Sequence, residues 1–476
     1  MNQRDNLQFA QIVKMLKIGL EIHCQLKTAT KLFSRANTSG ASNTQVYPFD
    51  LGLPGSLPII NMYAVGMALK AALAFQCKIH SPIKFDRKHY HYPDLFVGYQ
   101  ITQKFYPIGI NGKLLAVGEK DPFYVDIECI QLEQDTAKTN LLSNCEYLLD
   151  ANRAGMPLIE IVTAPIIHSA DDTIATLKAI QSIVRVLEIS DGDLESGSFR
   201  CDVNISKNGN NRIELKNLNS FKDIQNAIKY ESQRHDTEHI VQETRRWDPI
   251  NFKTFPLRLK ETTSDYKFLP DADIPILHIP KEVIDSIKIP MLPLSLALLL
   301  EKKHSIDRNM AFKIASIPSF YSYFKQLCGS FKGSDILKWF AEYDSKLNSK
   351  SIFFNESLER IPVYEAIPVN RMLAFLNLVV NRKVTGLNTK LLFDDILLKS
   401  GDVNDLSKPY LSGNTDISVL INTVITLNPS QYEKMHNAAA KDRKIAHAWL
   451  TGQVLKLAKG KADPRRISKE IADYKK

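Results

Sequence analysis

One stretch of the sequence sets the character of the first half of the chain: Arg212-Ile213-Glu214-Leu215-Lys216-Asn217-Leu218-Asn219-Ser220-Phe221. Apolar residues alternate with Glu214 and Lys216, and side chains two residues apart on a β-strand lie on the same face. We therefore predict a strand with one apolar face and one face that carries a carboxylate and an ammonium group. Two interpretations follow, a polar functional site or a surface strand with one hydrated face.

Similar strand patterns extend from Ile18 to about Pro280, separated by turns. The predicted strands include residues 17–26, 124–132, 157–162 and 200–205. Helical spacing of apolar residues appears at 64–75 and at 171–187, where Ser169 is a suitable N-cap. This mixture indicates the α+β fold class.

The pattern changes after Pro290, where helical spacing dominates. The predicted helices include 294–303, 308–314, 334–343, 417–427, 429–440 and 445–460. A chain of 476 residues is long enough for two or three domains. We predict a sheet-rich domain at 1–290, a helical domain at 291–405 and a small helical tail at 406–476.

The positive charge of the chain is concentrated near its end. The formal net charge is +9, with an isoelectric point near 9.0. Between Gln431 and Lys476, twelve Lys or Arg residues stand against five Asp or Glu residues, a balance of +7. Such a segment favours a polyanionic partner, for which nucleic acid is the first candidate.

Several classes of protein are disfavoured by what the sequence lacks. It contains no run of about 18 apolar residues, so we expect no membrane span. Six cysteines without a C-x-x-C pair argue against a disulfide framework and a thiolate zinc site, and favour a reducing compartment. Residues 1–16 lack an apolar core, so we expect no secretory signal and at most a weak organelle-targeting signal.

Carboxylates recur beside or within the predicted apolar strands: Glu21, Glu133, Glu160, Asp202 and Glu214. One such residue alone is expected on the hydrated face of an antiparallel sheet. The set is harder to explain in this way, because buried carboxylates need a metal ion or a cationic partner. Glu21 and His23 share a strand face, and oxygen ligands with one imidazole suit magnesium or manganese. The alternative for His23 is a hydrogen-bonded core histidine.

Cations and aromatic rings are interleaved in the run Lys84-Phe85-Asp86-Arg87-Lys88-His89-Tyr90-His91-Tyr92-Pro93-Asp94. This mixture suits phosphates and bases, although a solvated strand followed by a Pro-Asp turn would look the same. Arg245-Arg246-Trp247 is a second, weaker cluster of this kind. The sequence has no P-loop motif and no G-x-S-x-G or C-x-x-C motif, so any ATP would be held by metal, Lys and Arg.

A series of motifs stands in order along the chain: Gly19-Leu20-Glu21-Ile22-His23, Leu53-Pro54-Gly55-Ser56-Leu57-Pro58, Phe85-Asp86-Arg87-Lys88, Gly98-Tyr99-Gln100-Ile101, Asn152-Arg153-Ala154-Gly155, Arg200-Cys201-Asp202-Val203-Asn204, 214–220 and 242–247. Near the end come Gly452-Gln453-Val454-Leu455-Lys456 and Gly460-Lys461-Ala462-Asp463-Pro464. Together these motifs resemble the B subunit of glutamyl/aspartyl-tRNA amidotransferase (GatB), and the last two look like the tRNA-binding end of the family.

The resemblance implies a kinase-like cradle domain, a helical domain and a YqeY-like tail. In that family, ATP and magnesium activate the side-chain carboxylate of Glu or Asp misacylated onto tRNA-Gln or tRNA-Asn, and ammonia then displaces phosphate. The ammonia comes from a separate amidase subunit, GatA, and the third subunit is of the GatC or the fungal GatF type. The compartment implied is the mitochondrial matrix, with the bacterial cytoplasm as the alternative.

The resemblance also assigns roles to residues of this chain. Catalytic residues would be Glu133, Lys84 and Glu214, with Lys84 near the acceptor end or the phosphates. The magnesium ligands would be Glu21, His23, Glu133, Glu160, Asp202 and Glu214. Contacts to tRNA would come from Lys456, Lys459, Lys461, Arg465 and Arg466.

Three departures from the family pattern stand out. Glu133-Gln134-Asp135 replaces the Glu-Glu-Asp of many bacterial members, as in mitochondrial ones. Gln134→Glu would tighten magnesium binding if residue 134 faces the metal and be nearly neutral if it points away, and we expect tighter binding. Residues 32–35 and 46–50 contain no cysteine where some bacterial members carry zinc-binding pairs, so we expect no zinc. Thr163-Ala164-Pro165-Ile166 replaces a usual Ser-Glu-Pro-Asp. The competing hypotheses are a tRNA-binding scaffold that has lost catalysis and a stand-alone tRNA-binding protein.

Overall fold

The computed structural model describes residues 15–118, 121–141, 146–259, 266–348, 361–411, 417–437, 440–458 and 464–474. The chain forms two compact units, one of residues 1–298 and 315–317 and one of residues 299–314 and 318–476. The predicted boundaries at 290 and 405 remain predictions. The start of the chain, where a targeting signal would lie, falls outside the described residues.

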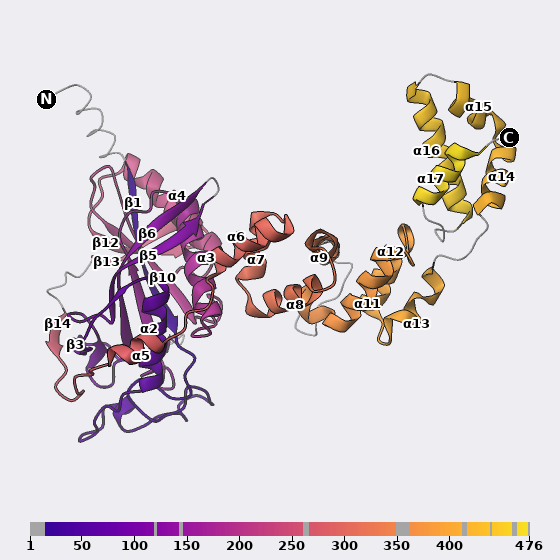
Figure 1. The fold of residues 1–476 in the computed structure, drawn as a ribbon. Helices are drawn as coiled ribbons and strands as arrows, with labels where there is room; N and C mark the ends of the chain where they lie inside the picture. Colours follow the sequence, from indigo (N-terminus) through magenta and orange to yellow (C-terminus); the bar gives the residue numbers. More distant parts are fainter. Residues whose placement is uncertain are drawn as a thin grey trace. The chain divides into compact units, whose positions relative to one another are not determined.

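The first unit is built on a nine-stranded sheet, in the order β13-β12-β11-β10-β1-β9-β6-β5-β2 (Figure 1). All neighbours described in this sheet are antiparallel except β11 and β12. The strands are β1 (Leu16–Gln25), β2 (Lys78–Ile79), β5 (Gly109–Val117), β6 (Pro122–Gln134), β9 (Pro157–Thr163), β10 (Phe199–Lys207), β11 (Ile213–Lys216), β12 (Glu243–Asp248) and β13 (Lys253–Leu259). The predicted strands and the α+β class are confirmed.

Strand β1 shows why the sheet has two unlike faces. Leu20, Ile22 and Cys24 are buried in the main core, whereas Glu21 and His23 alternate with them and are only partly buried. The apolar face is covered by α2 (Met62–Ala74), α3 (Ala170–Val186) and α4 (Phe221–Thr237). Burial of this face provides the main favourable free energy of folding, and it leaves the polar residues on the opposite face.

The helices begin where the sequence places caps. The side chain of Ser169 accepts a hydrogen bond from the Asp172 backbone N–H at the start of α3, as predicted. Ser220 does the same for Asp223 at the start of α4. Each cap satisfies a backbone donor that the helix leaves unpaired, an effect of about 1 kcal/mol. Because Ser220 closely follows β11, its cap also fixes where the chain leaves the sheet.

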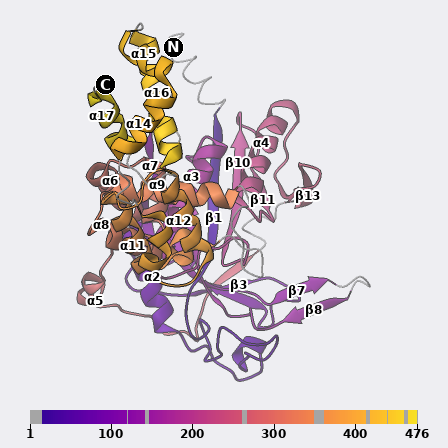
Figure 2. The same cartoon turned by 90° about the vertical axis from the view of Figure 1, so that its right-hand side faces the viewer.

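Two smaller sheets complete the first unit. One has the order β14-β3-β4 and consists of β3 (Asp86–His89), β4 (Tyr99–Thr102) and β14 (Lys267–Pro270). The other is a hairpin of β7 (Lys138–Leu141) and β8 (Tyr147–Asp150), which projects from the unit in Figure 2. The short elements are η1 (Phe49–Leu51) and α5 (Lys281–Ser286). The cation and aromatic run 84–94 thus forms β3 and the turn after it.

The second unit is helical, as predicted. The helices that follow α5 are α6 (Pro293–His304), α7 (Arg308–Ala315), α8 (Pro318–Cys328), α9 (Gly333–Asn348), α10 (Val363–Ala366), α11 (Val369–Val380), α12 (Leu387–Leu398), α13 (Val403–Ser407), η3 (Lys408–Tyr410), α14 (Ile417–Leu427), α15 (Pro429–Asn437), α16 (Ala440–Leu457) and α17 (Pro464–Asp473). Trp339 packs against Phe375 and Phe393, with ring centroids 4.7 and 5.0 Å away. In the described residues, none of the helices has the length and apolar character that crossing a membrane requires.

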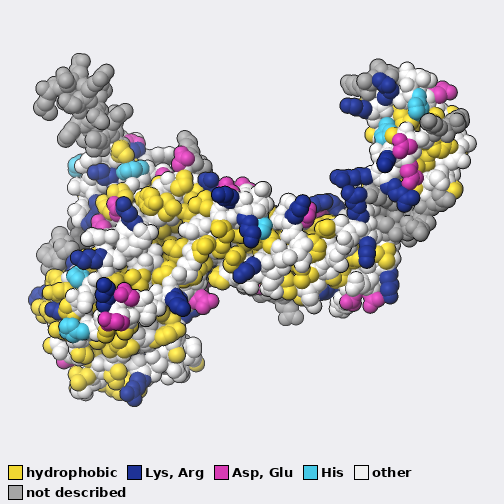
Figure 3. Space-filling view, viewed as in Figure 1, with side chains coloured by type: hydrophobic (Ala, Val, Ile, Leu, Met, Phe, Trp, Pro, Cys, Tyr) yellow, Lys and Arg dark blue, Asp and Glu magenta, His cyan; other side chains and the backbone are white. Residues whose placement is uncertain are grey.

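The last four helices share a hydrophobic core of their own. Ile421 and Val424 of α14 are buried with Leu450 and Val454 of α16 and Ile467 of α17. Lys and Arg side chains, in dark blue, are visible over this module in Figure 3. The core begins at α14, so a deletion from Gln431 would divide it. The basic tail is therefore best removed as a whole, from residue 412.

Deleting residues 412–476 should weaken tRNA binding and make its salt dependence shallower, because contacts between cations and phosphates are lost. Filter binding at several salt concentrations measures both quantities. A double variant, Lys456→Ala with Arg465→Ala, leaves the core of α14–α17 intact. It should change the tRNA affinity and its salt dependence in the same direction as the deletion, by a smaller amount. Equal tRNA affinity for the truncated and full-length proteins at the same ionic strength would show that the tail is not a nucleic-acid element.

Candidate functional site

The opening stretch forms β11, and its two charges lie on one face as predicted. The Lys216 Nζ atom lies 3.4 Å from Glu214 Oε1 and 2.5 Å from Asp202 Oδ2 on β10. Burial alone would favour the neutral amine, but the charges of Asp202 and Glu214 outweigh it and raise the pKa of Lys216. The ammonium is therefore a fixed positive charge among carboxylates.

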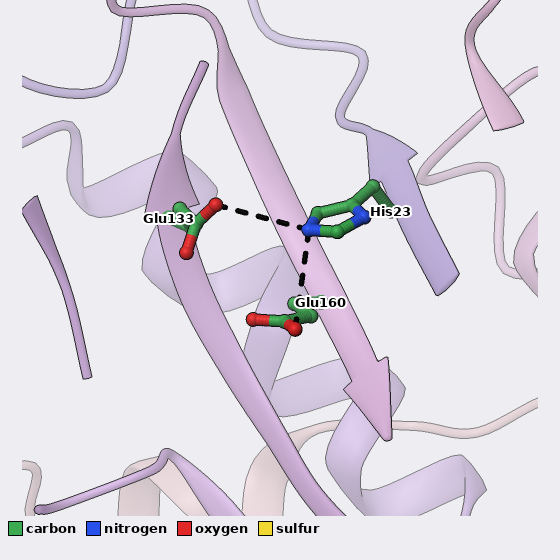
Figure 4. Close-up of side chains that lie close together, drawn as sticks. All are labelled: His23, Glu133 and Glu160. Carbon is green, nitrogen blue, oxygen red and sulfur yellow. Dashed lines mark ion pairs between the residues drawn. The ribbon is translucent and has the colours of Figure 1, made fainter. Parts of the chain in front are cut away.

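Three neighbouring strands bring His23, Glu133 and Glu160 together (Figure 4). His23 of β1 is the register partner of Glu160 on β9, and β6 supplies Glu133 from the other side of β9. The His23 Nε2 atom lies 3.8 Å from Glu133 Oε1 and 3.9 Å from Glu160 Oε1. The three donor atoms lie within 4.8 Å of one another, so a single cation between them would meet all three.

A second cluster consists of Glu21, Asp202 and Glu214, with donor atoms again within 4.8 Å of one another. Glu21 on β1 pairs in register with Asp202 on β10. The Asn204 side-chain amide donates to Glu21 Oε1 at 2.8 Å, and the Thr244 hydroxyl donates to Glu214 Oε2 at 2.8 Å. These hydrogen bonds orient the carboxylates, as partners of metal-ligating carboxylates commonly do.

Both clusters hold carboxyl groups that resist ionisation. Burial first, and then the charge of Glu160, raise the pKa of Glu133, although Lys88 and His23 partly oppose the shift. Burial, Glu160 and Glu214 likewise raise the pKa of Glu21. A bound divalent cation would relieve this cost by supplying the missing positive charge. The five carboxylates and one imidazole of the two clusters are donors suited to a hard divalent ion.

The clusters line a cavity of about 610 Å³ on the polar face of the large sheet. Its walls also carry the cations Lys17, Lys88, Lys104, Arg212 and Lys216. Tyr266 and Phe268, next to and within β14, add aromatic rings, and the Lys88 Nζ atom lies 4.9 Å from the centre of the Tyr266 ring. Cations, acidic groups and aromatic rings around one space are suited to a nucleotide with its metal ion.

A second recess of about 350 Å³ adjoins the first. Its lining includes four residues that also line the larger cavity, namely His23, Glu133, Asp202 and Lys216. Its other walls include Arg200 of β10 and Asn217, which directly follows β11. The acidic clusters thus lie where two spaces meet.

The structure separates Lys84 from the other predicted catalytic residues. Its Nζ atom lies over the Tyr106 ring, 4.4 Å from the centroid, and Lys84 lines neither of the two spaces. Lys88, four residues later in the same run, lines the larger cavity instead. Nothing in the sequence pattern distinguishes the two lysines. Lys88 lies within β3, where it pairs with Phe268 of β14 and Gln100 of β4, whereas Lys84 precedes the strand.

Gln134 does not face the acidic clusters. Glu133 lines the larger cavity, whereas the next residue of β6 lines a small pocket on the other side with Asp50, Asp94 and Asp135. Gln134 is buried, and its side-chain amide lies 3.5 Å from the Tyr99 carbonyl oxygen. Since neighbouring residues of a strand point to opposite faces, Gln134 points away from the clusters, and this is the orientation for which Gln134→Glu should be nearly neutral rather than tighten magnesium binding.

The Arg245-Arg246-Trp247 cluster is mainly structural. Arg245 is buried between Glu231 and Glu243, at 3.1 and 2.7 Å. The Trp247 indole N–H donates to Asp223 Oδ1 at 3.0 Å. The interpretation of this cluster as a site for phosphates and bases is therefore wrong for Arg245 and Trp247, which stabilise the packing of α4 on β12.

A buried ion pair lies in the region of residues 31–50, which contains no cysteine. Lys31 and Asp50 are both buried, and the Lys31 Nζ atom lies 3.3 Å from Asp50 Oδ2. The same carboxylate oxygen accepts hydrogen bonds from the Ser34 hydroxyl at 3.0 Å and from the Tyr47 backbone N–H at 2.9 Å. Sequence reasoning missed this network, because Lys31 and Asp50 lie 19 residues apart, outside the predicted strands and helices.

Three of the five residues predicted to contact tRNA lie in the described part of the chain. Lys456 is exposed on α16, and Arg465 and Arg466 are exposed on α17, where Arg466 pairs with Glu470 at 2.8 Å. Lys459 and Lys461 lie outside the described residues.

The large sheet carries two acidic clusters on a polar face, and both clusters could hold a metal ion. Residues 16–285 match the family of the GatB/GatE catalytic domain, and residues 322–474 match the GatB (YqeY) domain family. The chain is 37% identical over 475 residues to the B subunit of the aspartyl/glutamyl-tRNA(Asn/Gln) amidotransferase of Legionella pneumophila (strain Lens), covering 95% of this chain and 97% of the relative.

A mitochondrial relative is similarly close. The B subunit of the mitochondrial glutamyl-tRNA(Gln) amidotransferase of Scheffersomyces stipitis is 35% identical over 491 residues, covering 96% of this chain and 94% of the relative. The corresponding protein of Mycoplasmopsis synoviae is 35% identical over 477 residues, with 96% and 97% covered. The chain therefore belongs to the GatB family, the B subunits of the tRNA-dependent amidotransferases, which are ligases of protein biosynthesis.

Neutralising a carboxylate of the clusters should stabilise the metal-free protein. Glu133→Gln removes a buried charge and its repulsion with Glu160. We expect the free energy of unfolding without divalent ions to increase by about 1 kcal/mol, which corresponds to a rise in melting temperature of roughly 2–4 °C. The further rise on adding magnesium should shrink, because a ligand is lost. Thermal unfolding with and without magnesium measures both effects.

Asp248→Asn is the matched control, because hydrogen bonds from Asn251 and Ile250 lower the pKa of Asp248 and its charge is already favourable. This variant should not raise the melting temperature. A Glu133→Gln protein that is less stable without metal and equally responsive to magnesium would exclude Glu133 from a cation site.

Gln134→Glu should leave the magnesium requirement of the chain unchanged, because its side chain lies on the other side of β6 from the clusters. Magnesium titrations of both proteins, followed by thermal unfolding, test this outcome. Tighter magnesium binding in the variant would contradict the placement of Gln134.

Proposed function

We propose that this chain uses ATP and magnesium to activate the side-chain carboxylate of Glu or Asp on misacylated tRNA-Gln or tRNA-Asn. The γ-phosphoryl group passes to the carboxylate, and ammonia then displaces phosphate to give the amide. Magnesium, when bound, would polarise the phosphoryl oxygens and neutralise the charge that develops during transfer. One observation carries the proposal: two acidic clusters that could hold metal ions share a single cavity with five Lys and Arg side chains.

The donor set fits this use of magnesium. His23, Glu133 and Glu160 would hold one ion, and Glu21, Asp202 and Glu214 a second. Of these, Glu133 and Glu214 are the proposed catalytic residues, because each is buried beside the cavity with its orientation fixed by a hydrogen bond. Lys216 stays protonated between Asp202 and Glu214 and holds the two carboxylates in place.

Cations of the chain would bind the phosphates. Lys88 and Lys104 come from the side of the small sheet, and Lys17 and Arg212 from the large one. Lys84 remains a proposed contact to the acceptor end or the phosphates, and its position on the Tyr106 ring makes Lys88 the stronger candidate for the phosphates.

The partners follow from the same proposal. A GatA-type amidase subunit would supply ammonia, and a GatC-type or fungal GatF-type subunit would complete the complex. The tRNA would be held in part by the tail, through Lys456, Arg465 and Arg466 and through Lys459 and Lys461. The mitochondrial matrix is the proposed compartment, with the bacterial cytoplasm as the alternative. Catalysis is favoured over a binding scaffold because all six donor residues are present and clustered.

His23→Ala should abolish the amidation of misacylated tRNA while the partner still hydrolyses glutamine, because the lost imidazole serves only carboxylate activation. The assay uses the complex with its partner subunits and follows ADP, amidated tRNA and glutamate separately. His168→Ala, a change of a histidine on the surface of the same unit, is the control and should retain all three activities. Undiminished amidation by the His23 variant would remove the proposed metal role.

A further inference from the structure

A network of buried charges lies between α4 and β12, on the side of the sheet away from the acidic clusters. Its members are ionisable side chains of these two elements, namely Glu231, Arg234, His235, Glu243 and Arg245. The Arg245 Nη1 atom donates to Glu243 Oε1 at 2.7 Å, and its Nε atom lies 3.1 Å from Glu231 Oε1. Apolar side chains of similar volume would often stabilise the protein as well or better, because buried charges must first lose their hydration. This α4–β12 network is therefore not explained by stability alone.

Arg245 holds three elements in one alignment. It contacts Glu231 of α4 and Glu243 of its own strand. Its Nε atom also donates to the Thr254 hydroxyl at 2.8 Å, and its Nη2 atom donates to the Thr254 carbonyl oxygen at 2.9 Å. Thr254 lies on β13. Because the donors of a guanidinium form a rigid fork, these contacts fix both the spacing and the alignment of the three elements.

The backbone pairing around β12 leaves its register weakly determined. β11 and β12 are parallel and joined through α4, so no tight turn sets their alignment. The pairing with β13 is irregular at the same place, because Thr244 faces Arg258 whereas Arg245 faces Pro256. Leu257 is thus an extra residue of β13, and such a bulge re-aims the side chains beside it. An interaction between side chains has to supply the missing alignment.

We propose that Arg245, with Glu231, is a positioning residue for Glu214 and acts by fixing the register of β12. Neighbouring residues of a strand point to opposite faces, so the contacts of Arg245 on one face decide where Thr244 lies on the other. In this register Thr244 is the partner of Glu214 on β11, and its hydroxyl donates to Glu214 Oε2 at 2.8 Å. Thr244 is buried in the wall of the larger cavity. The inference rests on the proposed function, in which Glu214 is a metal ligand.

A slip of β12 by one residue would alter the second acidic cluster directly. Glu243 or Arg245 would then stand opposite Glu214, so that a like charge or a competing cation would replace a neutral donor. Asn204, the partner of Glu214 on β10, donates to Glu21 Oε1 at 2.8 Å. The row of partners that begins on β12 therefore continues to a second carboxylate of the cluster.

Thr244→Val tests the contact with Glu214, because valine keeps the branched shape of threonine and removes the hydroxyl. The probe is Mn²⁺, whose binding to the complex with its partner subunits is followed by electron paramagnetic resonance. The affinity for Mn²⁺ should fall about tenfold to hundredfold, the loss typical when the hydrogen-bond partner of a metal ligand is removed. Thr244→Ser keeps the hydroxyl and should largely restore the affinity, which a loss of packing alone would not allow.

Glu231→Leu combined with Arg245→Met, the paired variant, tests the α4–β12 network itself. It removes one charge of each sign. Arg234 keeps its contacts with Glu238 and Glu243 at 3.2 and 3.4 Å, so no charge is left alone in a buried place and the protein should fold. Arg245→Lys is a milder change that keeps the charge and loses the fork of donors, and it should lower the affinity for Mn²⁺ in the same direction.

The paired variant and Thr244→Val should not act independently. The paired variant should lower the affinity for Mn²⁺ about tenfold. Adding Thr244→Val to it should lower the affinity little further, because the hydroxyl has already left Glu214. A network that served stability alone would give multiplicative effects, as independent sites do.

Lys31→Met combined with Asp50→Leu is the matched control. It removes another buried ion pair of the same unit, and neither Lys31 nor Asp50 lines the larger cavity or the adjoining recess. This change should lower the melting temperature and leave the affinity for Mn²⁺ unaltered. In its background Thr244→Val should keep its full effect.

Two results would overturn the inference: multiplicative effects of Thr244→Val and the paired variant, or an unchanged affinity for Mn²⁺ in either of them. Glu214→Gln distinguishes failure of the proposed function. If that variant binds Mn²⁺ as tightly as the unaltered complex, Glu214 is not a metal ligand and the proposed function fails together with the inference. If it binds Mn²⁺ weakly while Thr244→Val and the paired variant bind normally, only the positioning role is excluded.

Discussion

Repulsion among five carboxylates on one face of a sheet is the constraint on which the rest of the structure depends. These groups are drawn from β1, β6, β9, β10 and β11, and they stay together only because the opposite face of the sheet is firmly packed under α2, α3 and α4. Lys216 offsets part of the repulsion, and amides such as Asn204 and Gln100 orient the oxygens. The remainder is an energetic cost stored at the site, which a cation can release.

Strand register turns residues that are scattered in the sequence into two clusters. Glu21 faces Asp202 and His23 faces Glu160 because β1 lies between β10 and β9 in an antiparallel arrangement. A slip of one residue would place these groups in the apolar core, so the hydrophobic pattern that fixes the fold also fixes the site. The alternation of apolar and polar residues along the strands therefore determines both the packing of the sheet and the placement of the acidic clusters.

Much of this arrangement could be predicted from the sequence, and the limits have physical causes. The strands around Glu21, Glu160 and Glu214 follow from local alternation, and the cap at Ser169 follows from the chemistry of helix ends. Pairing between distant segments does not follow from local pattern. The choice of Lys88 over Lys84 at the cavity depends on β14, whose Phe268 pairs with Lys88 from far along the chain. The orientation of Gln134 could also be predicted, because adjacent residues of a strand point to opposite faces and Glu133 lies on the face of the clusters.

The Lys31–Asp50 pair determines how two segments of the first unit are held together. It joins the segment around Lys31 to η1, which contains Asp50, and it is assembled entirely from atoms of the chain. The groups that hold it are the Lys31 ammonium, the Asp50 carboxylate, the Ser34 hydroxyl and the Tyr47 backbone N–H. Replacing either partner would destabilise the unit, because the remaining charge would be buried without a counter-charge. The two segments are therefore held together only while both charges are present, and each of the two residues depends on the other.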